Sequence, residues 1–346
     1  MLTKKLKTVV FMAGDKYGCG YYRMLLPSIS LCRMGIPGHV MTVDRLHLYD
    51  IADTIVIQRP VDQSVIELVD QAHTNGMKVV YELDDNLWDL PTWNQSHPFW
   101  SPVRIAITSE ILKRCDRAVT TTEYLANIMR QFNKDVMVVP NAIFDQKYID
   151  LPTQLSYKTK TVIGWVGSSF HKKDTEIFKT LIRLLLEKYP DIGFLMMGEP
   201  PPKELSPFAN RVIALPFVEP IYYHQILSSF NMHIGLAPLV DHNFNRAKSP
   251  IKLVEYLYTN TFPICSDIEP YANFKKEKET SCLLVPTASE QAGTISEWMD
   301  TIGWCIENVE TVGKWAEDGK QYVLDNYNIL CPKMAELYKK AYFVLD

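Results

Sequence analysis

The chain has 346 residues, of which 47% are hydrophobic and 22% charged, so it is neither disordered nor small enough for one ordinary core. Two domains are therefore expected. The 36 Lys and Arg residues nearly balance the 40 Asp and Glu residues, and the net charge of -4 gives no overall attraction to nucleic acid or to an acidic membrane.

The cysteines and the start of the chain indicate a compartment. The seven cysteines are scattered and form no CxxC pair, which favours reduced thiols over a zinc or disulfide framework. The basic start MLTKKLK leads into an apolar run that is too short for a signal peptide or a membrane span. We therefore expect a cytoplasmic protein, in the host cytoplasm if the gene is viral, without stable membrane insertion. The oligomeric state is not indicated.

The first half of the chain alternates short β-branched runs with amphipathic stretches, which is typical of βαβ units around a parallel sheet. The expected strands are Thr8–Met12, Val40–Val43, Thr54–Gln58, Lys78–Glu82, Ala118–Thr121 and Val136–Val139. The expected helices cover residues 22–34, 62–75, 103–114 and 123–132. Residues 141–160 are polar and show no sustained period, which indicates a connection between two domains.

The second half repeats this alternation. The expected strands are Val162–Val166, Gly193–Met197, Val212–Leu215, His233–Leu236, Phe262–Cys265 and Cys282–Val285. The expected helices cover residues 174–188, 221–230, 249–259, 289–308 and 311–325, and a last apolar stripe follows in Pro332–Phe343. The fold class is therefore α/β, with two Rossmann-like, doubly wound parallel-sheet domains. We expect them at residues 1–150 and 151–330, with residues 331–346 returning to the first.

A glycine-punctuated loop, GDKYGCGYYRMLLP, follows the first expected strand and opens a helix near Tyr21. Backbone amides at such a helix start can bind a phosphate, with Gly18 and Gly20 allowing close approach. Arg23 stands where a dinucleotide-binding GxGxxG motif has its third glycine, so that motif is incomplete. Gly18, Gly20 and Arg23 are candidates for donor contact, and a turn that needs glycine without any ligand is the alternative.

Clustered carboxylates follow the fourth expected strand in YELDDNLWDLP. Because the carboxyl ends of parallel strands face the ligand crevice, Asp84 and Asp85 are candidates for contact with a sugar hydroxyl or an acceptor. Helix capping and loop structure are one alternative, and a DxD-like metal site is another, since hard cations favour clustered carboxylates. The aromatic segment PTWNQSHPFW that comes next is either an acceptor wall or a packed surface loop.

The first strand of the second half ends in GWVGSSFHKKDTEIF, where small hydroxyl residues, a histidine and lysines supply donors suited to a diphosphate or a sugar ring. Asp174 or Thr175 can cap the helix that follows. The candidates for donor contact are Gly167, Ser168, Ser169, His171 and Lys172. One lysine of this segment is expected to be solvent-exposed without a role. For His171, a role in the site and a purely structural role are both open.

The strongest pattern is IGLAPLVDHNFNRAKSPIKLVEYLYTNTFPICSD, a strand, a polar loop and a helix that starts near Ser249 and Pro250. Free amides at this helix start point toward the crevice. Lys248 precedes the start and Lys252 lies one turn in, so both can reach a bound diphosphate. Glu255 lies on the same face as Lys252, at a reach suited to a ribose diol. An exposed Lys252–Glu255 helix pair without function is the alternative.

Together these segments resemble the GT-B glycosyltransferases, in particular the retaining group-1, GT4-like families. The resemblance covers nearly the whole chain and is carried by GCGYYR, YELDDNLWDLP, TTEYLA, VVPNAI, GWVGSSFHKKD, and SPIKLVEY followed by FPICSD. It implies two Rossmann-like domains that face a central cleft. It also implies a nucleotide on the C-terminal domain, an acceptor on the N-terminal domain, and a last helix that crosses back to the first domain.

The resemblance assigns roles to single positions. Glu255 matches the second Glu of the family's Ex7E motif, which binds the donor ribose, whereas Ala247 stands where the first Glu is expected. This departure leaves the donor sugar undetermined. The remaining implied contacts are Lys248, Ser249 and Lys252 to the diphosphate, Phe217 and Val218 to the nucleobase, and Gly18 and Gly20 to the phosphates.

The implied reaction is transfer of a sugar from a UDP- or GDP-sugar to an acceptor hydroxyl, with retention at the anomeric carbon and without a bound metal or other cofactor. The candidates for catalytic roles are Asp84, Asp85, His171 and Lys252. The expected acceptor is an envelope glycan or a hydroxymethylated base of DNA. A GT-B-like nucleotide-sugar epimerase and a non-catalytic sugar- or nucleic-acid-binding module are the alternatives.

Overall fold

The computed structural model describes residues 7–42, 52–145 and 159–344, which divide into two compact units. The first unit contains the described residues up to Asp145, the short segment Ala247–Ser249, and the residues from Asp325 onward. The second unit contains the described residues 159–246 and Pro250–Leu324. The boundary expected between residues 150 and 151 and the strand end expected at Val43 lie outside the described residues.

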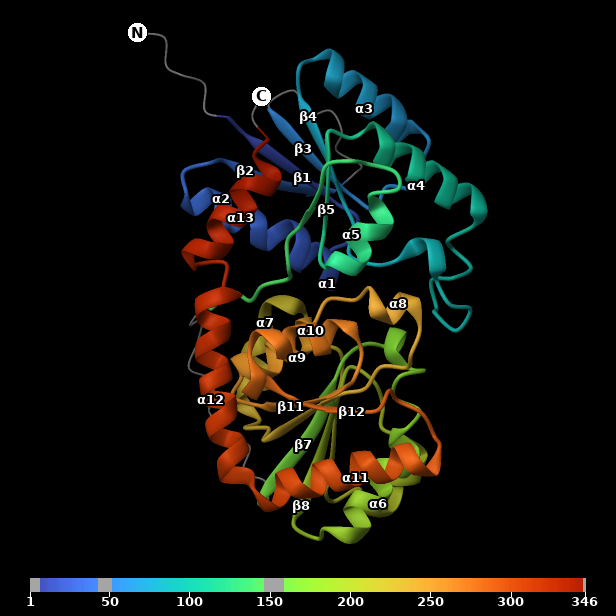
Figure 1. Cartoon of the computed structure of the whole chain (residues 1–346), viewed down its shortest axis with the longest axis vertical. Helices are drawn as coiled ribbons and strands as arrows, with labels where there is room; N and C mark the ends of the chain where they lie inside the picture. The colour runs from blue at the N-terminus through green and yellow to red at the C-terminus, as the bar shows by residue number, and fades with distance from the viewer. Residues whose placement is uncertain (1–6, 43–51, 146–158, 345–346) are drawn as a thin grey trace. The chain divides into compact units, whose positions relative to one another are not determined.

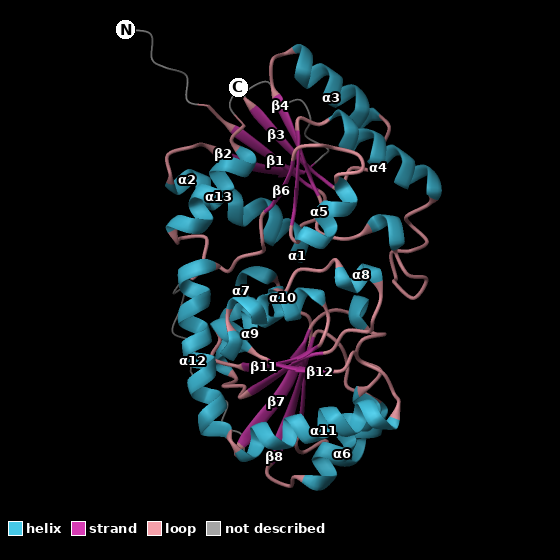
Figure 2. Ribbon diagram, in the orientation of Figure 1, coloured by secondary structure: helices cyan, strands magenta, loops and turns pink. Residues whose placement is uncertain are grey.

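The first unit is built around six parallel strands in the spatial order β2-β1-β3-β4-β5-β6 (Figure 2). Their bounds are β1 Val9–Ala13, β2 Gly38–Thr42, β3 Thr54–Gln58, β4 Lys78–Glu82, β5 Arg117–Thr120 and β6 Val136–Val138. Every residue of β3 is buried, as expected for a β-branched run covered on both faces by helices.

The helices of the first unit cover both faces of this sheet. They are α1 Gly18–Gly20, the π-helical turn η1 Tyr21–Leu25, α2 Leu26–Arg33, α3 Ser64–Thr74, the 3-10 turn η3 Leu87–Asp89, α4 Pro102–Arg114, α5 Glu123–Met129 and α13 Pro332–Tyr342. Figure 1 shows α13 beside α2 on one side of the sheet and α3 beside α4 on the other. The apolar stripe of α13 is buried, and its Tyr342 ring meets Phe11 of β1 edge-on at 5.3 Å. The last helix therefore packs into the core of the first unit.

The second unit contains another sheet of six parallel strands, in the order β9-β8-β7-β10-β11-β12. Their bounds are β7 Thr161–Val166, β8 Ile192–Met197, β9 Val212–Leu215, β10 Ile234–Ala237, β11 Phe262–Ser266 and β12 Leu283–Val285. Numbered within the unit this order is 3-2-1-4-5-6, the Rossmann order. The expected α/β class with two Rossmann-like sheets is therefore confirmed.

The second unit has longer helices around its sheet. They are α6 Phe178–Lys188, α7 Pro220–Ser229, α8 Asn243–Arg246, α9 Ile251–Tyr258, α10 Glu269–Glu277, α11 Ala292–Glu307 and α12 Val309–Asn326, with 3-10 turns η4 Ser169–His171, η5 Lys203–Phe208 and η6 Glu279–Ser281. α6 and α11 pack on each other over a core that includes Trp165, Phe178 and Trp298. The sequence pattern missed α8 and α10 and started α6 four residues early.

Candidate functional site

Each sheet has one topological switch point, where neighbouring strands lead to connections that run in opposite directions. It lies between β1 and β3 in the first unit and between β7 and β10 in the second. Open α/β sheets bind ligands beyond the carboxyl ends of the strands at such points. The loops that follow these four strands are therefore the expected positions of ligand-binding residues.

Lys252 reaches the carboxyl end of β7 from the first turn of α9. Its Nζ donates a hydrogen bond to the Val166 carbonyl and lies 5.3 Å from the centre of the Trp165 ring. A Cβ at Gly167 would come within 2.5 Å of that ring and 3.2 Å of the Lys252 Nζ. Gly198 approaches from β8 with φ +94°, and a Cβ there would lie 1.8 Å from the Gly167 carbonyl oxygen. Only glycine fits at either position, so exposed backbone and a buried cation meet here.

Glu255 lies one turn further along α9 and is 7% exposed. The Tyr223 hydroxyl donates to its Oε2 at 3.2 Å, and the Nε2 of His224 lies 3.9 Å from its Oε1. Burial lowers the pKa of His224 to about 4, so this histidine is neutral at pH 7 and forms no ion pair with Glu255. Because Lys252 is also only 9% exposed, the alternative of an exposed Lys252–Glu255 surface pair is excluded.

Asp174 joins the two loops at the switch point of the second sheet. Its Oδ1 accepts from the Val240 amide at 2.9 Å and from the Asn245 Nδ2 at 3.0 Å, and its Oδ2 lies 2.9 Å from His171 Nδ1. A carboxylate can only accept, so His171 carries a proton on Nδ1. Asp174 is 4% exposed and does not cap α6 as the sequence suggested. This connection was missed because Val240 and Asn245 are distant in sequence.

The other candidates of this loop lie around η4. Ser168 stands before the turn and its carbonyl accepts from the His171 amide at 3.0 Å. Ser169 is half-buried, whereas Lys172 is exposed. The structure thus brings Gly167, Ser168 and His171 to the end of β7 beside Lys252, and leaves Lys172 on the surface.

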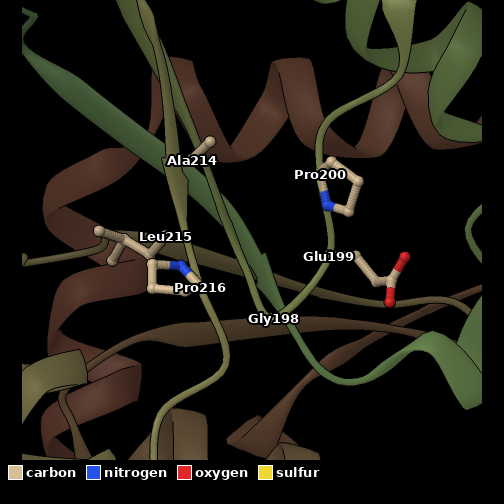
Figure 3. Close-up of a pocket in the computed structure, with 6 residues that line it drawn as sticks. All are labelled: Gly198, Glu199, Pro200, Ala214, Leu215 and Pro216. Carbon is tan, nitrogen blue, oxygen red and sulfur yellow. The ribbon is translucent and has the colours of Figure 1, made fainter.

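A cavity of about 290 Å³ opens at the carboxyl ends of β8 and β9. Figure 3 shows its lining, with Gly198, Glu199 and Pro200 on one wall and Ala214, Leu215 and Pro216 on the other. Phe217, which is 50% exposed, and Val218 continue the chain directly after Pro216. The volume is at the small end of ligand pockets and suits one ring system rather than a whole nucleotide sugar.

The glycine loop of the first unit is closed on itself by Asp15. The Asp15 Oδ1 accepts from the amides of Tyr17 at 2.8 Å and Gly20 at 3.1 Å. A Cβ at Gly20 would lie 1.9 Å from the Asp15 carbonyl oxygen, whereas a Cβ at Gly18 would meet nothing within 4 Å. Gly20 is thus explained by the loop itself, and a phosphate would have to compete with the Asp15 carboxylate for these amides.

Arg23 does not lie where a donor could contact it, which corrects the expectation from the sequence. It is 0% exposed, within the π-helical turn η1. Its Nε donates to Glu82 at 2.5 Å, and its remaining nitrogens donate to the Val139 carbonyl at 2.7 Å, to Asn141 Oδ1 at 3.0 Å and to the Tyr342 hydroxyl at 3.4 Å. The guanidinium is therefore held by four hydrogen bonds within the core of the first unit, one of which ties α13 to the sheet.

Asp84 and Asp85 lie at the carboxyl end of β4 in an environment of paired charges. Arg59, for which no sequence motif indicated a role, forms an ion pair with Asp15, and its Nε lies 4.0 Å from Asp84 Oδ1. Its φ of +45° is unusual for a residue with a side chain and marks local strain. Burial raises the pKa of Asp85, while Lys248, whose Nζ lies 3.9 Å away, opposes that rise.

The segment Ala247–Ser249 belongs to the first unit. The Thr122 hydroxyl donates to the Ala247 carbonyl at 2.8 Å while it also caps α5 by accepting from the Leu125 amide. The Ser249 hydroxyl oxygen is buried and has no hydrogen-bond partner among the described residues. Lys248 and Ser249 thus belong to the same unit as Asp85, the first. Lys252 and Glu255 belong to the same unit as Gly167, the second.

The aromatic segment after the carboxylates is partly exposed. Trp93 is 43% and Phe99 45% exposed, and the Arg104 guanidinium stacks 3.9 Å from the centre of the Phe99 ring. Across residues 7–42, 52–145 and 159–344, no three or more His, Cys, Asp or Glu side chains are grouped to hold a metal ion. Among the helices of these same ranges, none has both the length and the apolar character to cross a bilayer.

Solved structures share this fold. HepE from Anabaena, in complex with UDP-glucose, matches with a TM-score of 0.69 at 13% identity, over 98% of this chain and 100% of that chain. A Listeria monocytogenes protein described as a UDP-N-acetylglucosamine 2-epimerase matches with a TM-score of 0.59 at 12% identity, over 99% and 98%. A variant of TarM from S. aureus, in complex with fondaparinux, alpha-GlcNAc-glycerol and UDP, matches with 0.61 at 9% identity, over 85% and 56%.

Neither a protein-family model nor a curated protein sequence matches the chain. At 9 to 13% identity, the structural matches identify the fold of the chain but not its substrate. With two parallel six-stranded sheets, one of them in the Rossmann order, the chain has the GT-B fold.

Proposed function

We propose that this protein is a glycosyltransferase that transfers a sugar from a nucleoside-diphosphate sugar to an acceptor hydroxyl. The observation that carries the proposal is the pairing of a buried Lys252 with the bare backbone of Gly167 at the switch point of the second sheet. A cation held in a shielded site next to backbone that lacks a side chain suits a diphosphate, because charge attraction is strong where water is excluded. The UDP complexes of HepE and TarM are consistent with this choice.

The donor would extend over the second unit. Glu255 would bind the ribose diol, with Tyr223 holding one of its oxygens. The base would enter the cavity between Gly198 and Pro216, beside Phe217 and Val218, and either UDP or GDP is a candidate donor. Lys248 and Ser249, which the resemblance assigns to the diphosphate, belong to the first unit with Asp85 and are left out of this donor site.

Transfer would break the bond between the anomeric carbon and the diphosphate oxygen and form a bond from that carbon to the acceptor oxygen. The hydroxyl proton would pass to the leaving diphosphate on the same face, which gives retention and needs no protein nucleophile. Lys252 would stabilise the negative charge that develops on the diphosphate, while the Nε2 of His171, which has no proton when Nδ1 donates to Asp174, would accept a hydrogen bond from a hydroxyl of the sugar. We expect no metal requirement, and turnover should be unchanged by EDTA and by added magnesium.

The acceptor would be bound by the first unit, with Asp84 and Asp85 as contacts to its hydroxyl. An envelope glycan and a hydroxymethylated base of DNA are the two acceptor classes in question. We expect the reaction in the cytoplasm, because all seven cysteines are unpaired, as in a reducing compartment.

A nucleotide-binding assay tests the donor site. The UDP and GDP forms of glucose, mannose and N-acetylglucosamine should be screened by thermal shift, and one is expected to raise the melting temperature. Lys252→Met and Glu255→Gln should abolish that shift, while Lys179→Met, an exposed lysine of α6, should keep it. A donor that binds both site variants as tightly as the native protein would rule out this site.

A nucleotide-sugar epimerase is the second candidate, favoured by the match to the Listeria protein over nearly the full length of both chains. Incubation of the bound UDP-sugar without any acceptor separates the two functions. An epimerase converts the donor to its C2 epimer under these conditions, whereas a transferase yields only slow hydrolysis. A product spectrum from proton NMR decides between them.

A further inference from the structure

Four buried polar side chains at the carboxyl edge of the first sheet have atoms without a hydrogen-bond partner in the described part of the chain. These atoms are Gln58 Nε2, Asn86 Oδ1, Thr120 Oγ1 and Thr121 Oγ1. None of the four residues is more than 3% exposed. A buried polar group without a partner is destabilising, and native proteins keep few of them. Several at one edge therefore indicate that a polar molecule completes their hydrogen bonds.

The register of the strands places these four residues at the same carboxyl edge of the sheet. β3 ends at Gln58, which is in register with Glu82 at the end of β4, and Glu82 is in register with Val119 of β5. Asn86 follows β4, while Thr120 and Thr121 end β5 and begin the next loop. Since the strands are parallel and adjacent, all four residues lie at the same edge, beside the switch point between β1 and β3.

The unpartnered atoms include both donors and acceptors. The Gln58 Oε1 accepts from the Gly14 amide at 3.0 Å, so the Nε2 that remains can only donate. The Asn86 Oδ1 can only accept, and each threonine hydroxyl can do both. Asp84 Oδ1, buried and 4.0 Å from Arg59, offers another acceptor. Hydroxyl groups, which donate and accept at once, match this set.

The charges at this edge favour an uncharged molecule. Arg59 faces Asp15 and Asp84, and Lys248 faces Asp85. Each of these two cations therefore already has a carboxylate beside it. A phosphodiester would bring acceptors only, with a negative charge, against carboxylates that already occupy the cations.

We propose that this edge binds an uncharged, hydroxyl-rich sugar ring, the acceptor of the transfer, through Gln58, Asn86 and Thr121. The assignment rests on the proposed function and deepens it by naming the acceptor class as a carbohydrate rather than DNA. Asp84, held by Arg59, is then the carboxylate that receives a hydroxyl of the ring.

Saturation-transfer NMR on the full chain tests the proposal without any donor. The probes are the methyl glycosides of glucose, galactose, mannose and N-acetylglucosamine, and at least one should receive saturation. Thr121→Val and Asn86→Leu should lose that signal. Thr74→Val, which alters an exposed threonine of α3, should retain it. The melting temperature of Thr121→Val should be equal to or above that of the native protein, because the substitution removes a buried hydroxyl without a partner.

Several outcomes would overturn the proposal. No signal from any of the four glycosides would do so, as would a signal that both variants retain. Displacement of the glycoside by a duplex with 5-hydroxymethylcytosine would assign the edge to DNA. Displacement by UDP-glucose but not by UDP would assign it to the sugar of the donor. A protein that binds UDP through Lys252 but no glycoside would refute this inference alone and leave the donor site intact.

Discussion

Replacement of Asp174 tests both the stability and the chemistry assigned to the second unit. Asp174→Ala would leave the Val240 amide and the Asn245 side chain without their buried acceptor. A hydrogen bond to a charged group contributes about 1.5–3 kcal/mol, so the loss of these two should lower the free energy of unfolding by about 3–6 kcal/mol. The contact to His171 is nearer the surface and should add little to that loss.

Asp174→Asn tests the effect of the His171 tautomer on turnover separately from the effect on the free energy of unfolding. An asparagine can keep the oxygen that accepts from Val240 and Asn245, but its amide nitrogen would then face the His171 Nδ1 proton. Two donors cannot bond to each other, so His171 must move its proton to Nε2. We expect a change in unfolding free energy of at most about 1 kcal/mol. If the Nε2 of His171 must accept a hydrogen bond from a sugar hydroxyl during transfer, the proton placed there should lower turnover by about 10- to 100-fold.

The assay pairs urea unfolding, followed by tryptophan fluorescence, with release of nucleoside diphosphate at saturating donor. Asp191→Ala, which removes an exposed carboxylate of the same unit, is the matched control and should be neutral in both measurements. A loss of less than about 1 kcal/mol in Asp174→Ala would show that the connection does not hold the two loops together. Native turnover in Asp174→Asn would show that the tautomer of His171 has no role.

Three further predictions concern the buried groups. His224, with its pKa near 4 in the fold against 6.5 in the unfolded chain, stays neutral while the unfolded chain takes up a proton, so stability falls as pH drops from 6.5 to 4. Between pH 7 and 5 the native protein should lose about 2 kcal/mol of unfolding free energy that a His224→Gln variant does not lose, as measured by urea titration. Arg23→Met should cost about 3–5 kcal/mol in the same assay because a buried carboxylate loses its partner, whereas Arg33→Met, at an exposed position of α2, should cost little. Gly20→Ala should destabilise the first unit by about 2 kcal/mol or more and Gly18→Ala should not, and an unchanged melting temperature for Gly20→Ala would contradict the close approach of the loop.

The strands could be predicted from the sequence because burial on both faces leaves a pattern within each strand. β3 and β4 have the predicted bounds, since runs such as Thr54–Gln58 and Lys78–Glu82 are β-branched and bounded by polar residues. The start of α6 was wrong because Asp174 looks like a helix cap, and only the contacts with Val240 and Asn245 show otherwise. α10 was missed although Pro270 marks its first turn.

The site residues likewise divide into those that local sequence position predicts and those whose partners are distant in sequence. Gly167 and Lys252 were found because position relative to a strand end or helix start is a local property. Arg23 was misplaced because its partners Glu82 and Tyr342 lie 59 and 319 residues away. A signal did exist, since Glu82 ends a strand of otherwise buried residues, and a buried carboxylate requires a cation. The sequence could not say which arginine supplies it.

In both units a carboxylate links the two loops that border the switch point. Where the connections of neighbouring strands diverge, no crossover helix joins the two loops that border the ligand site. In each unit a carboxylate from the loop after the first strand makes the connection: Asp15 pairs with Arg59 beyond β3, and Asp174 accepts from Val240 beyond β10. Loops fixed in this way need less ordering when a ligand arrives, which lowers the entropic cost of binding. We therefore expect the carboxylates to act mainly by positioning the loops, whatever donor and acceptor the protein uses.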